Sequence, residues 1–147
     1  VAEAEQRPPP TETVEGLLAT PFPTPQEAAP WLGEWIGDVW MNDDELFEGR
    51  PRHYLRLRVV DGKVEGEVEN DPAPGMKDVE TITYLVVQPG RLTYGFMNGM
   101  RPRGMLLFEG EMREGKLEGT SRFGGIDFRY PDGMEKPVIR FRFERWR

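Results

Sequence analysis

Apolar and polar residues alternate along most of the chain after residue 31, a pattern typical of strands with one buried face. The clearest example is Arg52–Val60. In this segment Leu55 and Leu57 share one face, while Arg56 and Arg58 lie on the other. The segment therefore predicts a strand that is half buried and half exposed to solvent.

Short turns separate the alternating segments. Asp61-Gly62 favours a two-residue hairpin because both residues accept positive φ. The return segment, Lys63–Glu69, alternates again, so its glutamates should face the arginines of the preceding strand and fix the register. Two further turns have the same character, at Pro89-Gly90 and Glu114-Gly115.

The pattern predicts an all-β, antiparallel fold of eight strands in sequential order. The segments are Trp35–Met41, Arg52–Val60, Lys63–Glu69, Val79–Val87, Arg91–Met97, Met105–Met112, Lys116–Phe123 and Val138–Trp146, with Pro131-Asp132-Gly133 turning the chain from Ile126–Tyr130 into the last. Eight such strands can close into an up-and-down β-barrel, which leaves no exposed sheet edge. A flattened sandwich of two sheets is the alternative, and we favour the barrel.

Residues 1–30 differ from the rest, because they hold seven of the fourteen prolines. This composition favours an extended segment or linker, so we expect the folded domain at residues 31–147. Leu17, Leu18 and Phe22 are apolar enough to dock on that domain as a latch. The chain begins with valine, which suggests removal of a preceding segment, and we favour an exported protein, periplasmic or extracellular, over a cytoplasmic one.

The composition excludes several classes of protein. The 147 residues carry 26 acidic and 19 basic side chains, a net charge of -7, so we expect no nucleic-acid partner. With no cysteine and a single histidine, the chain offers no disulfide, thiolate or histidine-rich metal site, and we predict neither a metal nor a cofactor. No apolar run approaches the roughly 20 residues that a transmembrane helix needs.

The start of the first strand carries a short motif. Trp31-Leu-Gly-Glu-Trp35-Ile-Gly37 contains a Gly-x-Trp pattern that resembles the signature opening the first strand of lipocalins and other calycins. The resemblance implies structural roles for Gly33 and Trp35. In that family the tryptophan closes one end of the barrel beneath an arginine of the last strand, for which Arg142 and Arg145 are both candidates.

The chain from Trp31 onward is also similar to lipocalin-like domains attached to the C-terminal end of bacterial serine hydrolases of the β-lactamase-like class. The shared features include a strand beginning Gly-x-Leu-x-Gly-Thr, here Gly115-Lys-Leu-Glu-Gly-Thr120. The long helix and the cysteines of typical lipocalins are missing from this sequence. Their absence favours a minimal bacterial barrel over a transport lipocalin.

Several residues are candidates for a ligand site. Tyr94 is the best candidate for a polar group inside the barrel, because it shares a face with Leu92 and Phe96. Residues 97–105, around an Asn-Gly turn, combine methionines that adapt to apolar ligands with arginines that bind anions, although ordinary turn residues are the alternative. The predicted ligand-binding residues are Tyr84, Tyr94, Phe96, Met97, Met100, Arg101 and Phe108.

Two other features, a histidine and an acidic segment, are interpreted as surface residues and not as parts of a functional site. We expect His53 at the rim of the barrel as a surface residue, rather than as a general base or a haem ligand. The acidic residues 42–45 lack the spacing of an EF-hand, so we expect a solvated loop there.

Three functional hypotheses follow. The first is a non-catalytic barrel that binds a small apolar or amphipathic ligand in its lumen. The second is an accessory domain that packs against the catalytic domain of a larger hydrolase or against its own copies. The third is a barrel enzyme, such as a cyclase or isomerase, with one interior acid–base residue. We favour the first hypothesis, and a lumen filled by phenylalanines would favour the second.

Overall fold

One antiparallel sheet dominates the computed structural model, which describes residues 13–41, 52–73, 76–97, 104–124 and 139–146. Three short helical segments precede the sheet: α2 (Val14–Leu18), α3 (Pro25–Ala28) and the 3-10 helix η1 (Ala29–Trp31). The nine strands are β1 (Gly33–Met41), β2 (Arg52–Val60), β3 (Lys63–Ala73), β4 (Met76–Thr81), β5 (Tyr84–Gln88), β6 (Arg91–Met97), β7 (Met105–Arg113), β8 (Lys116–Gly124) and β9 (Ile139–Arg145).

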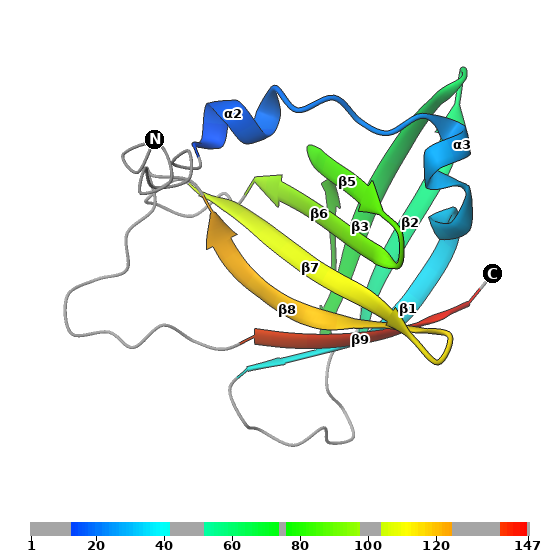
Figure 1. Ribbon diagram of the computed structural model, residues 1–147. Helices are drawn as coiled ribbons and strands as arrows, with labels where there is room; N and C mark the ends of the chain where they lie inside the picture. Colours follow the sequence, from blue (N-terminus) through cyan, green and yellow to red (C-terminus); the bar gives the residue numbers. More distant parts are fainter. Residues whose placement is uncertain (1–12, 42–51, 74–75, 98–103, 125–138, 147) are drawn as a thin grey trace, which may run out of the picture.

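The strands are paired in the order β4-β3-β2-β1-β9-β8-β7-β6-β5. Apart from β4 and β5, which form the two edges, strands that follow one another along the chain are neighbours, and the first and last strands, β1 and β9, pair in the middle of the sheet. The sheet is strongly curled into an open half-barrel, with β5 and β6 in front of β2 and β3 in Figure 1. The prediction of an all-β, antiparallel, up-and-down fold is confirmed.

The prediction of a closed eight-stranded barrel is wrong. The expected single strand Val79–Val87 is divided into β4 and β5, which form the two edges of the sheet and do not pair with each other. At the division the chain changes partners. The backbone N–H of Ile82 donates to Gly66 in β3, and that of Thr83 donates to Gly95 in β6, both at 2.9 Å. One continuous strand cannot follow both neighbours as they diverge, so the hydrogen-bonded ladder stops there.

The hairpin prediction for β2 and β3 is confirmed. Asp61 and Gly62 have φ values of 51° and 77°, as a two-residue turn of this type requires. Arg56 lies opposite Glu67, and its guanidinium contacts the carboxylates of Glu34, Glu67 and Glu69, the last at 2.6 Å. The outer face of this hairpin is thus a network of ion pairs, and the inner face is apolar.

Two glycines let the sheet curl where side chains would prevent it. A Cβ atom on Gly37 in β1 would collide with the backbone carbonyl oxygen of Arg142, and one on Gly119 in β8 would collide with that of Glu109. Both positions lie within the paired parts of their strands. Glycine is therefore required there by close approach of neighbouring backbones.

One end of the curl is closed around Trp35, which is fully buried. Its indole Nε1 donates to the carbonyl oxygen of Trp31 at 3.0 Å. The guanidinium of Arg145 lies over the Trp35 ring, 4.3 Å from its centre, and donates to the carbonyl oxygens of Leu32 and Pro30 at 2.5 and 2.6 Å. The partner of Trp35 is thus Arg145.

The other candidate partner, Arg142, is turned to the outer face. Its Nε contacts the Glu118 carboxylate at 3.1 Å. The two arginines differ because residues 142 and 145 are an odd number of positions apart on β9, and successive side chains of a strand point to opposite faces.

The segment before the sheet packs on the sheet with apolar side chains. Ala28 and Trp31 belong to the inner core, with Phe22 packed against it. Leu17 of α2 instead packs with Met105 and Leu107, in a separate cluster on the other face of the sheet. Figure 1 shows this segment running along one side of the curled sheet, from α2 to α3. That a separate domain begins at residue 31 stays a prediction, although residues 13–31 contribute buried side chains.

Replacing Leu17 with alanine tests whether α2 is held by packing. Leu17 is 7% exposed, so Leu17→Ala should lower the free energy of unfolding by about 2 to 4 kcal/mol, as other buried leucines do. The neighbouring Leu18 is 45% exposed, and Leu18→Ala should change it by less than about 0.5 kcal/mol. Equal midpoints for the two variants in urea unfolding would contradict the docking of α2.

Candidate functional site

Phe108 is the centre of an aromatic cluster inside the curl. The ring of Tyr94 stacks on it in parallel, with centroids 4.9 Å apart, and Phe141 meets it edge-on at 5.3 Å. The imidazole of His53 also stacks on Phe108, at 5.3 Å, and stacks again on Phe143 at the same separation. These residues come from β2, β6, β7 and β9, so the cluster joins strands from distant parts of the sheet.

His53 is therefore an interior residue, and the expectation of a surface histidine at the rim is wrong. Its side chain is only 4% exposed. The strand β2 begins at Arg52, which places His53 on the same face as Leu55 and Leu57, both of them buried. The alternation of this segment contained the signal, since His53 continues the apolar face by one position.

Two buried hydroxyl groups flank Phe108. In the strand register Phe108 lies between Tyr94 on β6 and Ser121 on β8. Tyr94 is fully buried and Ser121 is 4% exposed. Within the part of the chain that the structure describes, neither the Tyr94 hydroxyl nor Ser121 Oγ has a hydrogen-bond partner. Leaving a buried polar group without a partner costs about 1 to 3 kcal/mol, so the two hydroxyls call for a functional explanation.

Ser121 was not among the residues predicted from the sequence. It lies on the same face of β8 as Leu117, which is fully buried, so alternation along Lys116–Gly124 assigns it to the interior. A small hydroxyl residue is also common on exposed strand faces, and nothing in its own residue type distinguished Ser121 from the neighbouring, exposed Thr120.

The Tyr94 phenol is held in its neutral form. Burial in this apolar interior raises the pKa of Tyr94 well above its ordinary value of 10.0, because the charged phenolate would lose its hydration. At neutral pH the group is therefore a phenol that can both donate and accept a hydrogen bond.

The other predicted ligand-binding residues are distributed over two faces of the sheet. Phe96 joins the inner cluster, with its ring 6.1 Å from that of Phe108. Tyr84 and Met97 pack instead against the cluster that Leu17 covers, on the opposite face. Met100 and Arg101 lie outside the described residues, as do the acidic residues 42–45.

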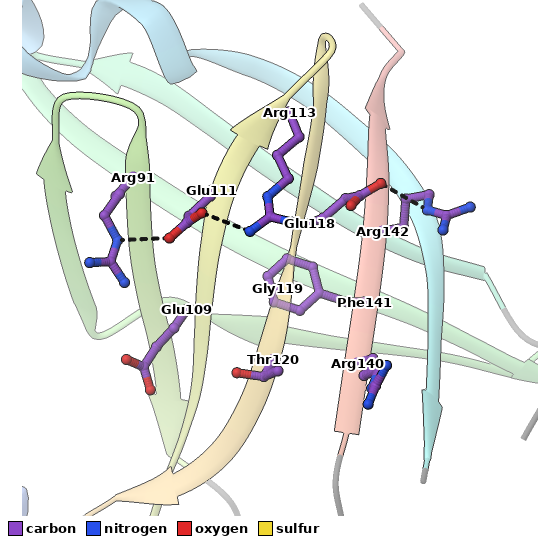
Figure 2. A pocket seen from close by; sticks show the side chains of 10 residues that line it. All are labelled: Arg91, Glu109, Glu111, Arg113, Glu118, Gly119, Thr120, Arg140, Phe141 and Arg142. Carbon is purple, nitrogen blue, oxygen red and sulfur yellow. Dashed lines mark hydrogen bonds and ion pairs between the residues drawn. The ribbon is translucent and has the colours of Figure 1, made fainter. Parts of the chain in front are cut away.

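A second candidate site is a groove of about 450 Å³ on the outer face of β6 to β9. Figure 2 shows its charged side chains in a line across these four strands: Arg91, Glu111, Arg113, Glu118 and Arg142. The line is already paired within itself. Glu111 contacts Arg91 at 3.6 Å and Arg113 at 3.1 Å, and Glu118 contacts Arg142.

An anion entering this groove would have to replace a glutamate at one of its arginines. The groove side chains are substantially exposed, and the pairs are worth little in water. The groove is therefore a solvated, charge-balanced face, and the interior cluster around Phe108 is the stronger candidate site.

Two further properties bear on the chemistry. Among the described residues, no three histidine, aspartate or glutamate side chains come together in a way that could hold a metal ion. In the same part of the chain, no helix is both long enough and apolar enough to cross a membrane.

Comparisons with known protein families, curated proteins and solved structures give no match to this chain.

Tyr94→Phe tests whether the buried hydroxyl lacks a partner in the protein. Removing an unpaired buried hydroxyl should raise the free energy of unfolding by about 1 kcal/mol, whereas removing a paired one would lower it. The matched control is Tyr54→Phe, since Tyr54 lies on the outer face beside Trp146 and should change little. Urea unfolding of both variants and the parent measures the difference.

Tyr94→Phe should also change how the stability of the folded state depends on pH in the alkaline range. Because the folded-state pKa of Tyr94 is raised, the unfolded chain loses this proton first, and the folded state loses stability as the pH rises above about 10. The loss from this group is at most about 1.4 kcal/mol per pH unit and should be missing in Tyr94→Phe. A destabilised Tyr94→Phe protein with an unchanged alkaline profile would contradict both expectations.

Proposed function

We propose that this protein binds a small apolar or amphipathic ligand inside the curled sheet, beside Phe108, and performs no catalysis. The observation that carries the proposal is the pair of buried hydroxyls, Tyr94 and Ser121, without partners among the described residues. A ligand with one polar group would supply the missing hydrogen bond, and the surrounding rings would receive its apolar part.

The position of these hydroxyls supports a site at one end of the curl. Trp35, near the start of β1, and Arg145, at the end of β9, close the opposite end. His53 is the second residue of β2, and Ser121 lies three residues before the end of β8. Tyr94 and Ser121 are level with each other on either side of Phe108, toward the end of the sheet away from Trp35, whereas His53 pairs with Gly37, two residues from Trp35.

We also propose a lipocalin-like relationship for the sheet. Three features support it: the Gly33-Glu34-Trp35 opening of β1, the sequential strand order, and the stacking of Arg145 on the buried Trp35. This relationship suits the binding of a small molecule in the interior. It assigns no particular ligand.

Catalysis has less support than binding. A phenol whose pKa is raised by burial is a poor general base at neutral pH, because it does not readily release its proton. His53 is buried and stacks on the rings of Phe108 and Phe143, so a substrate has little access to its imidazole.

A second candidate function is that of an accessory domain attached to a catalytic domain. The observation in its favour is the dense aromatic packing of the interior, where four phenylalanines are buried in contact with one another: Phe96, Phe108, Phe141 and Phe143. If the interior binds no ligand, the function of an accessory domain explains this packing better than ligand binding does.

Two small aromatic probes and a variant with a larger side chain beside Phe108 test the binding proposal. Toluene and p-cresol serve as probes, and their binding is followed by NMR shifts of the Phe108 and Tyr94 rings in the full chain. Saturable shifts with at least one probe are expected in the parent. Ser121→Leu should abolish them, because Ser121 lies directly opposite Phe108 in the strand register and a leucine there would exclude a ligand.

The control variant is Thr120→Leu, which adds the same side chain on the exposed face of the same strand. It should retain the saturable shifts. The proposal fails if neither probe produces saturable shifts in the parent, or if both leucine variants bind as the parent does. Thermal unfolding of each variant establishes that the comparison is made between folded proteins.

A further inference from the structure

We propose that the ligand is an uncharged aromatic molecule carrying a hydroxyl group, and that Tyr94 selects it by hydrogen bonding to that hydroxyl. This inference rests on the proposed function and narrows it to one chemical class. Three properties of the interior lead to it: its charge, the geometry of its rings and the kind of polar group it presents.

On the strands that the structure describes, the inner face presents no carboxylate or ammonium group at this end. The buried residues that surround Phe108 on the described strands are apolar apart from His53, Tyr94 and Ser121. The guanidinium of Arg145 reaches the inner side only at the Trp35 end, where it is bound to two backbone carbonyls. Moving a charged ligand from water to such a surface costs several kcal/mol unless a counter-charge is present, so a neutral ligand is favoured.

Four rings of the cluster are stacked, those of Tyr94, Phe108, His53 and Phe143, whereas Phe141 meets Phe108 edge-on. Tyr94 and Phe108 have an interplanar angle of 0°, Phe108 and His53 one of 28°, and His53 and Phe143 one of 9°. Stacked aromatic rings are the surroundings into which a planar aromatic ligand packs more closely than a branched aliphatic one. The cluster therefore favours an aromatic ligand.

The unpaired polar groups of the interior are hydroxyls, and a hydroxyl group on a ligand can pair with them. The phenol of Tyr94 and the Oγ of Ser121 can each donate one hydrogen bond and accept another. A ligand hydroxyl matches this dual character, since it can donate to one oxygen and accept from another. A site that pairs with a hydroxyl discriminates strongly against the analogue without it, because the buried partner is then left unpaired.

The test compares three probes of nearly the same shape: p-cresol, toluene and 4-methylbenzoate. Dissociation constants are measured by isothermal titration calorimetry or by NMR titration of the full chain at neutral pH. We expect p-cresol to bind at least about tenfold more tightly than toluene, which corresponds to one additional hydrogen bond. The charged 4-methylbenzoate should bind at least about a hundredfold more weakly than p-cresol.

Tyr94→Phe should remove the preference for p-cresol over toluene and leave the affinity for toluene unchanged within about threefold. Tyr54→Phe, which removes an outer-face hydroxyl, should keep the preference. Ser121→Ala provides a second variant, for which a partial loss of the preference is expected.

The outcomes separate this inference from the proposed function. Equal binding of p-cresol and toluene to the parent overturns the inference and leaves an apolar binding site in place. Tight binding of 4-methylbenzoate overturns it as well, as does an unchanged preference in Tyr94→Phe. Failure of all three probes to bind overturns the inference together with the proposed function.

Discussion

The structure depends first on the contact between Arg145 and Trp35. The guanidinium lies 4.3 Å from the centre of a fully buried indole and donates to two carbonyl oxygens, of Pro30 and Leu32, just before the first strand. One side chain at the end of β9 thereby holds the beginning of β1 and the segment that precedes it. The edge strands do not pair with each other, so this contact holds the curl together with the backbone hydrogen bonds of Ile82 and Thr83 to β3 and β6.

With that end closed, the opposite walls of the curl meet through aromatic rings. Phe108 on β7 contacts His53 on β2, and His53 continues to Phe143 on β9, so the interior is held by stacking as well as by apolar burial. The two unpaired hydroxyls, of Tyr94 and Ser121, lower the stability of this core. A polar group retained at such a cost is typical of a binding site, where the requirements of function and of stability differ.

The sequence was informative wherever local chemistry decides the structure. Alternation predicted the strands, and the turn at Asp61-Gly62 predicted the register of β2 and β3. The division of the expected strand at Ile82 was not predictable, because it results from the divergence of β3 and β6, which are remote in sequence. Position misled at His53, whose place at the start of the second strand suggested a residue at the rim although its strand face is buried.

The candidate site was recovered only in part. Tyr94 and Phe96 share the inner face, as their spacing suggested, and Phe108 lies on it as well, whereas Met97 and Tyr84 belong to the cluster under α2. The continuous apolar run Met105–Phe108 is typical of a strand that is covered on both faces, but the covering helix, α2, comes from a distant part of the chain. The sequence pattern alone therefore could not show which segment covers the second apolar face.

A double-mutant cycle between Trp35 and Arg145 is the most direct measurement of the central contact. If the arginine stabilises the buried indole, the loss of unfolding free energy in the double alanine variant should be smaller than the sum of the single losses, by about 0.5 to 3 kcal/mol. The same cycle with Arg142, which pairs with Glu118 on the outer face, should be additive within about 0.5 kcal/mol. Additivity between Trp35 and Arg145, or equal coupling for both arginines, would contradict the account.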